Sequence, residues 1–282
     1  MGGADMARGT VVKDKVIAIT GGARGIGYAT ARVLHRSGAK VAIGDVDDVA
    51  VKQAGVDLDV GFYARLDVTD RQSFTAFLDD VEREIGPVDV LINNAGVCPT
   101  GPFADEPDEV THRTLGINVF GVILGTKLAA ERMVKRGSGH IINIASLAGI
   151  NAVPGIATYC ATKHAVVGYT DTVRLELRGT GVTASAVLPT LTNTAMIDGV
   201  ASMPGMRNAE PEDIAAGIIR LIAKPRPRLT VTRQAGAMMA VTKRLPLRVN
   251  EAVTRALKAD RIFADAAGTE ARREYEGRAR SS

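Results

Sequence analysis

The stretch Thr20-Gly21-Gly22-Ala23-Arg24-Gly25-Ile26-Gly27 follows the short apolar run Val16–Ile19 and precedes a helix-forming segment, Tyr28–Ser37. A strand, a glycine turn and a helix in this order present backbone amides and a helix N-terminus to a pyrophosphate. The glycine spacing, G-x-x-x-G-x-G, differs from the G-x-G-x-x-G of other dinucleotide-binding folds. A purely structural turn is the alternative, but the position directly after the first strand favours a phosphate site.

Strands and helices continue to alternate along most of the chain. Further strands are expected at Lys40–Gly44, Val88–Ile92, His140–Ile144, Thr183–Leu188 and Leu229–Thr232, and helices at Phe74–Ile85, Val110–Met133, Tyr159–Arg178 and from Glu210 onward. Continuous apolar strands between helices predict an α/β fold with a doubly wound parallel sheet of Rossmann type, covered on both faces. We expect residues 1–12 to be a flexible N-terminus, residues 13–233 to form this single domain, and residues 234–282 to form a helical C-terminal extension.

The bulk composition restricts the class of protein. With 282 residues, 46% of them hydrophobic and 23% charged, the chain is long enough for one large domain with an appendage. No apolar run approaches the roughly 20 residues that span a bilayer, and the N-terminus lacks a hydrophobic signal region, so we expect a cytoplasmic protein. Cys98 and Cys160 are too few for a disulfide framework, and neither they nor the histidines have metal-ligand spacing, so no metal site is expected.

An acidic residue ends the second expected strand. Asp45 lies 18 residues after Gly27, where a carboxylate can accept hydrogen bonds from the adenosine ribose hydroxyls and repel a 2′-phosphate. This position favours NAD over NADP as the cofactor. Two observations weigh against it: Arg24 in the glycine turn could contact a phosphate, and Asp45 could be an ordinary loop acid beside other acids.

A tyrosine and a lysine further along the chain are spaced for shared chemistry. Tyr159 and Lys163 lie at i and i+4 on an expected helix, so their side chains share a face. A phenol with a pKa near ~10 is a poor base at neutral pH, but a neighbouring ammonium favours its phenolate. Tyr159 is therefore a candidate for proton transfer, with an amphipathic surface pair as the alternative interpretation.

Other short motifs accompany the glycine turn and this pair. They are Asp67-Val68, Asn93-Asn94-Ala95-Gly96, Asn118 and Ser146 ahead of Tyr159 and Lys163, and Pro189 followed by Thr194. Together these motifs resemble those of the short-chain dehydrogenase/reductase superfamily, over roughly Asp14 to Ala223. The resemblance implies a catalytic tetrad of Asn118, Ser146, Tyr159 and Lys163. It also implies cofactor contacts from Gly21, Arg24, Gly25, Ile26, Gly27, Asp45, Asp67, Val68, Asn94, Ala95, Gly96, Tyr159, Lys163, Pro189 and Thr194.

The resemblance implies a role for each member of the tetrad. Tyr159 would be the general acid/base of an alcohol–ketone interconversion, while the hydride belongs to the nicotinamide. Lys163 would lower the pKa of Tyr159 and hold the ribose of the nicotinamide half. Ser146 would polarise the substrate oxygen, and Asn118, at a kink in its helix, would hold a water that relays protons to Lys163. Taken singly, Ser146 could be a helix cap and Asn118 an ordinary polar residue.

Three loops, residues 97–99, 147–156 and 195–208, are expected to face the substrate. Their large side chains are mostly apolar and include Ile150, Val153, Met196, Ile197, Met203 and Met206. A hydrophobic secondary alcohol or its ketone, such as a steroid, retinoid or lipid-like molecule, fits these loops better than a sugar or a phosphorylated metabolite. The alternatives are that these residues only pack a lid on the domain, and that the protein is a non-catalytic nicotinamide-binding regulator.

The C-terminal extension is basic and amphipathic. Residues 224–282 hold 14 Lys and Arg against 6 Asp and Glu, and apolar residues recur from Met238 to Phe263 with a break at Pro246. Because acids are interleaved and aromatic residues are few, nucleic-acid binding is not expected. The extension could cover the active-site entrance, form a contact in the homodimer or homotetramer that the resemblance implies, or lie peripherally on a membrane. Packing on its own or a neighbouring subunit is the favoured interpretation.

Overall fold

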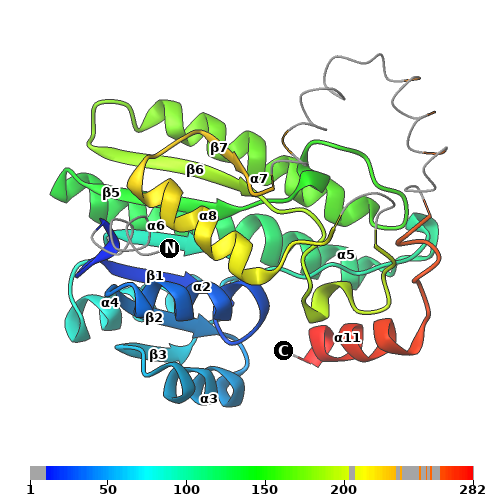
Figure 1. Ribbon diagram of the computed structural model, residues 1–282, viewed down its shortest axis with the longest axis horizontal. Helices are drawn as coiled ribbons and strands as arrows, with labels where there is room; N and C mark the ends of the chain where they lie inside the picture. Colours follow the sequence, from blue (N-terminus) through cyan, green and yellow to red (C-terminus); the bar gives the residue numbers. More distant parts are fainter. Residues whose placement is uncertain are drawn as a thin grey trace.

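The centre of the molecule is a parallel β-sheet, shown in Figure 1. The computed structural model describes residues 11–202, 207–232 and 261–281, together with the single positions 236, 248, 252 and 255. Within these residues the sheet has seven strands in the order β3-β2-β1-β4-β5-β6-β7, and every neighbouring pair is parallel. The strands are β1 (Val16–Thr20), β2 (Lys40–Asp45), β3 (Phe62–Arg65), β4 (Val90–Asn93), β5 (Gly139–Ile144), β6 (Val182–Leu188) and β7 (Arg228–Thr230). The doubly wound parallel sheet expected from the sequence is therefore confirmed.

The strand order reverses between β1 and β4, which are hydrogen-bonded neighbours in the sheet. In open α/β sheets, ligands bind outside the carboxyl ends of the strands at such a switch point. The glycine turn follows β1 and the Asn93–Gly96 segment follows β4, so both lie at this crevice.

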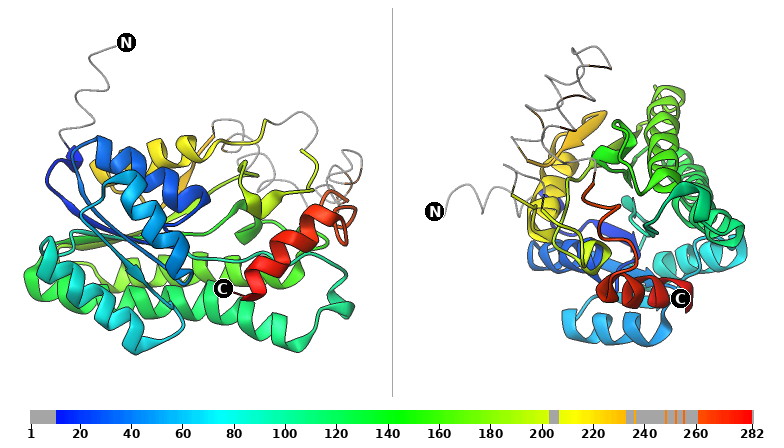
Figure 2. Two further views of the ribbon diagram at one scale, coloured as in Figure 1. Left: turned by 90° about the horizontal axis from the view of Figure 1, so that it is seen from below. Right: turned by 90° about the vertical axis from the view of Figure 1, so that its right-hand side faces the viewer.

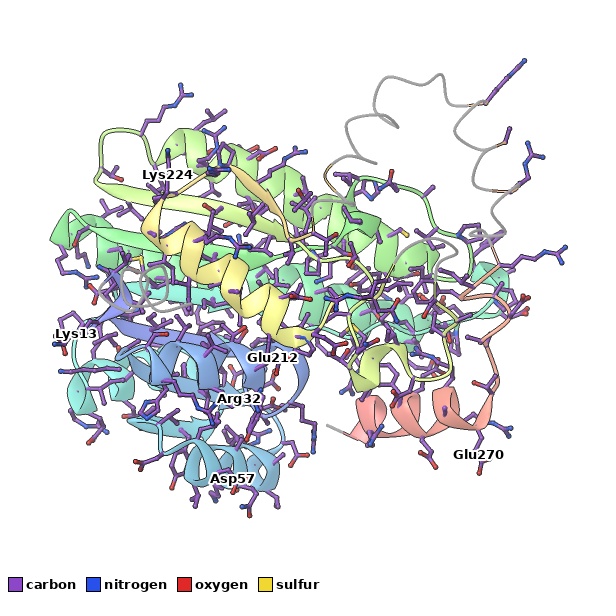
Figure 3. All side chains as sticks on the ribbon, in the orientation of Figure 1. Lys13, Arg32, Asp57, Glu212, Lys224 and Glu270 are labelled. Carbon is purple, nitrogen blue, oxygen red and sulfur yellow. The ribbon has the colours of Figure 1, made fainter. Side chains whose placement is uncertain are left out.

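Helices cover one face of the sheet with an apolar core. They are α2 (Gly25–Arg36), α3 (Asp48–Leu58) and α8 (Pro211–Ala223), and they pack on alternate strand residues such as Ile17, Ile19 and Ile43. An ion pair between Arg32 and Glu212, both labelled in Figure 3, joins α2 to α8 at the surface. Because successive side chains of a strand point to opposite faces of the sheet, only every second strand residue can contact α2 and α8.

The opposite face is covered by α4 (Arg71–Glu84), the long helix Asp108–Arg136, and α7 (Ala157–Glu176), as the two layers in Figure 2 show. The long helix comprises α5 (Asp108–Leu115), the π-helical turn η2 (Gly116–Phe120) and α6 (Gly121–Arg136). It is long and apolar enough to cross a membrane, but half of its most apolar stretch is buried in the fold. Because α6 packs against β4 and β5, we interpret it as a core helix.

The connection between β2 and α4 differs from the sequence-based expectation. The strand β3 and the helix α3 were not predicted. The four residues of β3 alternate between half-buried and exposed, and only the first three, Phe62-Tyr63-Ala64, are apolar, so the strand signal in the sequence is short. Helix α3 packs closely on this strand, because a Cβ at Gly55 would lie 2.1 Å from the Tyr63 ring.

The two ends of the chain are only partly described. Of the expected flexible N-terminus, residues 1–10 lie outside the described residues, while Val12 is fully buried in the core. In the C-terminal extension, residues 261–268 form turns and α11 (Glu270–Ser281) follows them. This helix lies beyond the carboxyl ends of the strands in Figures 1 and 2. The Pro246 break and most of the residues that motivated membrane contact lie outside the described residues.

Candidate active site

The glycine turn is a tightly packed backbone structure. Gly21 and Gly25 have φ values of +64° and +54°, in the left-handed region that side chains disfavour. A Cβ at Gly27 would lie 2.1 Å from the Gly21 carbonyl oxygen, so only glycine fits there. The Thr20 hydroxyl oxygen accepts hydrogen bonds from the Asn94 and Ala95 amides at 3.0 Å each. These contacts hold the turn after β1 against the segment after β4.

Asn94 completes this link from the other side. Its Nδ2 donates to the carbonyl oxygens of Thr20 at 2.9 Å and Gly21 at 3.0 Å. Next to it, Gly96 leaves room beside the catalytic candidates, since a Cβ there would lie 3.2 Å from Asn118 Oδ1 and 3.6 Å from Lys163 Nζ. A nicotinamide dinucleotide fits this cradle, because bare backbone lines it from the glycine turn to Gly96.

Asp45 lies at the end of β2 and supports the same turn. Its carboxylate accepts hydrogen bonds from the backbone amides of Ala23 at 3.1 Å and Asp47 at 3.3 Å. Burial raises the pKa of this carboxyl, and the two amides oppose that rise. Arg24 pairs with the Asp47 carboxylate at 2.6 Å on the surface.

The remaining expected cofactor residues follow two strands, β3 and β6. The Asp67 carboxylate accepts from the Thr69 amide and hydroxyl, and Val68 is buried against Gly121. The loop after β6 reaches the glycine turn, because a Cβ at Gly25 would lie 3.3 Å from the Thr194 methyl group. Leu147 donates its amide to the Pro189 carbonyl at 3.0 Å, which joins the loops after β5 and β6.

Asn118 lies in the π-helical turn η2 and is fully buried. Its Oδ1 accepts from the Val97 amide, and its Nδ2 donates to the Val97 carbonyl, both at 2.9 Å. Nδ2 also donates to the Thr162 hydroxyl at 3.1 Å. The kink implied by the family resemblance is thus a π turn, a feature that often occurs at functional sites. The Asn118 side chain fixes the loop after β4 and connects it to α7.

Ser146 follows β5 and caps the short 3-10 helix η3 (Leu147–Gly149), where its hydroxyl accepts from the Ala148 amide at 3.1 Å. The cap that the sequence offered as an alternative role is therefore present. It does not exclude a role in the site, because the same hydroxyl hydrogen-bonds the Tyr159 phenol, which acts to lower the pKa of Tyr159.

Tyr159 and Lys163 lie together on the buried face of α7. The Lys163 Nζ lies 5.5 Å from the Tyr159 ring centroid and donates to the Ile144 carbonyl at 2.9 Å. Burial lowers the pKa of Lys163 to about 8. Burial also raises the pKa of Tyr159 and outweighs the effect of its Ser146 hydrogen bond. The lowering of the Tyr159 pKa expected from Lys163 is therefore not seen here, because desolvation of the phenolate dominates.

Apolar side chains pack around Tyr159 in one cluster, which we call the chamber. Its buried members are Cys98, Ala148, Ile156, Tyr159, Cys160, Ile262 and Phe263, with Val153, Leu191, Met196 and Val200 packed against them. The three expected substrate loops all contribute. Ile150 does not, because it packs instead against a separate core cluster that includes Val166 and Val167. Met203 and Met206 lie outside the described residues.

Residues of α11 hold this chamber together, and the sequence did not single them out. Arg272, Tyr275 and Glu276 all hydrogen-bond to the loop after β4. Their i, i+3, i+4 spacing, which places them on one helix face, is the one signal in the sequence. A cleft of about 370 Å³ lies between this loop, α5 and α11. Among the described residues, no group of three or more His, Cys, Asp or Glu side chains could hold a metal ion.

A parallel sheet with a glycine-lined crevice at its switch point, next to a serine, a tyrosine and a lysine, defines a Rossmann-type dinucleotide-binding fold. The chain belongs to the short chain dehydrogenase family, whose sequence model matches residues 15–204. Three curated relatives and one solved structure agree with this assignment.

The curated relatives are all named as oxidoreductases. Probable oxidoreductase EphD of Mycobacterium tuberculosis is 30% identical over 257 residues, which cover 83% of this chain but only 43% of that protein. The 2-(S)-hydroxypropyl-CoM dehydrogenase 3 of Xanthobacter autotrophicus is 36% identical, with 75% of this chain and 91% of the relative covered. The 3-alpha-(or 20-beta)-hydroxysteroid dehydrogenase of M. tuberculosis is also 36% identical, with 75% and 78% covered.

The solved structure is a short-chain dehydrogenase/reductase from Burkholderia phymatum in complex with NAD. It superposes with a TM-score of 0.76 at 26% sequence identity, covering 82% of this chain and 94% of that chain. The chain therefore shares the family and the fold of short-chain dehydrogenases and reductases, and it spans less than half the length of the EphD relative. These comparisons favour an enzyme over the non-catalytic regulator considered from the sequence.

Proposed function

We propose that the protein interconverts a hydrophobic secondary alcohol and its ketone with NAD(H), and that Tyr159 is its general acid/base. The observation that carries the proposal is the convergence of Ser146, Tyr159 and Lys163 at the edge of an apolar chamber. The hydroxysteroid dehydrogenase named above supports an apolar ring system as the substrate class. We further propose a cytoplasmic homodimer or homotetramer.

The chemistry of the chain's own residues follows from their protonation. When bound, the nicotinamide would supply or accept the hydride. In reduction, the Tyr159 hydroxyl would donate its proton to the substrate oxygen, and the raised pKa keeps this phenol protonated at neutral pH. In oxidation, the phenolate form of Tyr159 would take the alcohol proton, and burial disfavours this form by raising the pKa of Tyr159. The Ser146 hydroxyl would hydrogen-bond the substrate oxygen and stabilise the charge that develops on it.

Lys163 and Asn118 act around this proton transfer. With a pKa of about 8, Lys163 is mostly protonated at neutral pH and places a positive charge near the Tyr159 ring. That charge would stabilise the phenolate left after proton donation. We propose that Asn118 keeps the loop after β4 in place and borders the water path to Lys163, since its amide holds both backbone groups of Val97.

NAD is proposed over NADP because of Asp45. Its carboxylate lies at the end of β2, beside the glycine turn, where it can accept from ribose hydroxyls and repel a 2′-phosphate. The surface ion pair between Arg24 and Asp47 also supports NAD, because it engages the basic side chain that could otherwise bind that phosphate.

The proposal is tested by Tyr159→Phe, with Tyr169→Phe as the matched control. Tyr169 lies ten residues further along α7, and its hydroxyl donates to the Ile123 carbonyl at 3.5 Å. Activity is measured with steroids, retinoids, acyl ketones and polyols, and NADH binding by fluorescence titration. We expect Tyr159→Phe to lose about 10²-fold or more of turnover while binding NADH within a few-fold of the parent. Turnover retained in Tyr159→Phe would overturn the mechanism.

A further inference from the structure

We propose that the C-terminal segment from Arg261 to Glu276 is a working part of the substrate site. In this proposal Ile262 and Phe263 form one wall of the chamber at Tyr159, and Arg272 is the positioning residue that holds the wall in place. The inference rests on the proposed function in one respect, namely that the chamber receives an apolar substrate.

The proposed wall, Ile262 and Phe263, packs in the same cluster as Tyr159, the candidate proton donor. Ile262 and Phe263 are 7% and 6% exposed and pack in one cluster with Cys98, Ile156 and Tyr159. Both come from the turns that precede α11 rather than from the helix itself. The chain's own C-terminal segment therefore contributes two of the buried side chains in the cluster that contains Tyr159.

The contact between this segment and the loop before α7 involves backbone as well as side chains. Gly155 has a φ of +84°, and a Cβ there would lie 2.7 Å from the Ala264 amide nitrogen. A side chain at this position would push the two backbones apart. The glycine is therefore required by the close approach of the C-terminal segment to the Ser146–Tyr159 loop.

Arg272 fastens the segment to two of the substrate loops. It is fully buried, and its two terminal nitrogens donate at 2.6 Å each to the carbonyl oxygens of Cys98 and Met196. Its Nε donates to the Thr100 hydroxyl at 3.2 Å. A buried guanidinium is tolerated only when its donors are satisfied. Here two of the acceptors are backbone carbonyls, so Arg272 fixes the main-chain positions of the loops after β4 and β6.

Two neighbours on the same helix face hold the other side of the first loop. The Tyr275 hydroxyl accepts from the Cys98 amide at 3.1 Å, and the Glu276 carboxylate accepts from the Thr100 amide and hydroxyl at 3.1 and 2.9 Å. Arg272 also stacks over the Tyr275 ring, 4.6 Å from its centroid, and lies 3.6 Å from Glu276. A single face of α11 thus holds both the amide and the carbonyl of Cys98.

Because of this arrangement, the reactivity of the Cys98 thiol reports whether the C-terminal segment is in place. Its side chain is 3% exposed within the chamber, and burial raises the pKa of its thiol to about 12. Only the thiolate of a cysteine reacts quickly with alkylating reagents. Displacing the C-terminal segment would expose this thiol and lower its pKa toward the ordinary value, and both changes speed alkylation.

The test compares Arg272→Gln with Arg273→Gln. Arg273 is the next residue of α11 and is exposed, so it controls for the lost charge and for the substitution itself. Alkylation of Cys98 by N-ethylmaleimide is followed at fixed pH by mass spectrometry of its peptide. We expect the rate to rise tenfold or more in Arg272→Gln and to stay within twofold in Arg273→Gln. An unchanged rate in Arg272→Gln would overturn the positioning role.

A second variant, Phe263→Ala, tests the wall while leaving Arg272 in place. It also replaces Arg272→Gln in the test if that variant does not fold. Its KM is compared for a small alcohol, cyclohexanol, and for a bulky steroid alcohol. We expect the steroid KM to change fivefold or more, with the cyclohexanol KM and NADH affinity nearly unchanged. Equal changes in both KM values, or none in either, would reject a wall that contacts the substrate.

The failure of the two proposals can be told apart. The alkylation rates need no turnover, so faster alkylation of Cys98 in Arg272→Gln supports the anchored wall even if no alcohol on the panel reacts. Conversely, turnover that depends on Tyr159, with alkylation and KM values unaffected by these substitutions, would leave the proposed function standing and remove this inference.

Discussion

The Asp45 carboxylate accepts a hydrogen bond from the glycine turn, and we expect it to select the cofactor that this turn binds. Amides of Ala23 and Asp47 donate to its two oxygens, so each oxygen already has one partner and retains a further lone pair for a ribose hydroxyl. Burial raises its pKa, which shows that the carboxylate is partly withdrawn from water. A charge held in this position interacts strongly with any group that replaces the ribose hydroxyl, because solvent screens it less.

We therefore expect Asp45→Asn to alter cofactor preference. The amide keeps an oxygen acceptor for the turn but removes the charge. Hydrogen bonds to charged groups contribute about 1.5–3 kcal/mol, so NADH affinity should fall about tenfold or more, while NADPH loses a repulsion and should weaken less. Fluorescence titration of both cofactors measures this, with Asp57→Asn on the exposed face of α3, labelled in Figure 3, as the control. An unchanged ratio of the two affinities would contradict the assignment of NAD.

Residue patterns predicted the site only where local spacing carries the information. Tyr159 and Lys163 share a helix face because of their i, i+4 spacing, and the structure places them beside Ser146. The spacing of Arg272, Tyr275 and Glu276 places them on one helix face but does not reveal that Arg272 is buried, since an arginine in a polar segment is normally solvated. Its burial depends on carbonyl groups of residues 98 and 196, far away in the sequence.

At the scale of elements, prediction succeeded for the buried strands and for the edge strand β7, and it missed the edge strand β3. The strand β1 is fully buried and has a longer apolar sequence, whereas the edge strand β3 is half-exposed and has only the three apolar residues Phe62, Tyr63 and Ala64. Likewise, α3 begins at an Asp47 cap that the sequence offered only as one acid among several. Central elements are determined by their own apolar patterns, while β3 and α3 depend on neighbours that the pattern does not reveal.

The pair β5 and β6 contains a buried histidine with consequences for stability. His140 is 6% exposed, and its Nε2 hydrogen-bonds the Ser185 hydroxyl at 2.9 Å across the two strands. Its Nδ1 has no hydrogen-bond partner among the described residues. Burial lowers the pKa of His140 from 6.5 to about 4, because the sheet offers the imidazolium no compensating charge.

This depressed pKa predicts a loss of stability in mild acid. Between pH 6.5 and pH 4 the unfolded chain binds a proton at His140 that the folded chain does not, so the free energy of unfolding falls as the pH falls. At pH 5 this difference in proton binding at His140 lowers the free energy of unfolding by about 2 kcal/mol. When the pH is lowered from 7 to 5, the free energy of unfolding of His140→Gln should therefore fall by about 2 kcal/mol less than that of the parent. Urea unfolding at the two pH values measures this difference. The exposed His112→Gln on α5 should behave like the parent, and identical pH dependence in all three proteins would contradict the prediction.

At the scale of the whole molecule, one layer of helices exposes large apolar side chains. Leu115, Phe120 and Val134 on the long helix and Leu175 on α7 are 40–49% exposed. The long helix and α7 lie side by side on the same face of the sheet, as Figure 2 shows. Single exposed apolar residues are ordinary, but a group on adjoining helices favours an interface.

We therefore expect copies of the chain to associate through the long helix and α7. Light scattering coupled to size-exclusion chromatography should give a mass two or four times that of one chain. Phe120→Glu or Leu175→Glu would bury a charge in the contact, which is costly without a partner, so either should lower the mass toward that of the monomer. Val49→Glu is the control, because Val49 is 80% exposed on α3, on the opposite face of the sheet. A monomeric parent protein would contradict association, and an assembly unaffected by Phe120→Glu and Leu175→Glu would place its interface on another surface, because charges in this helix pair would then remain in water.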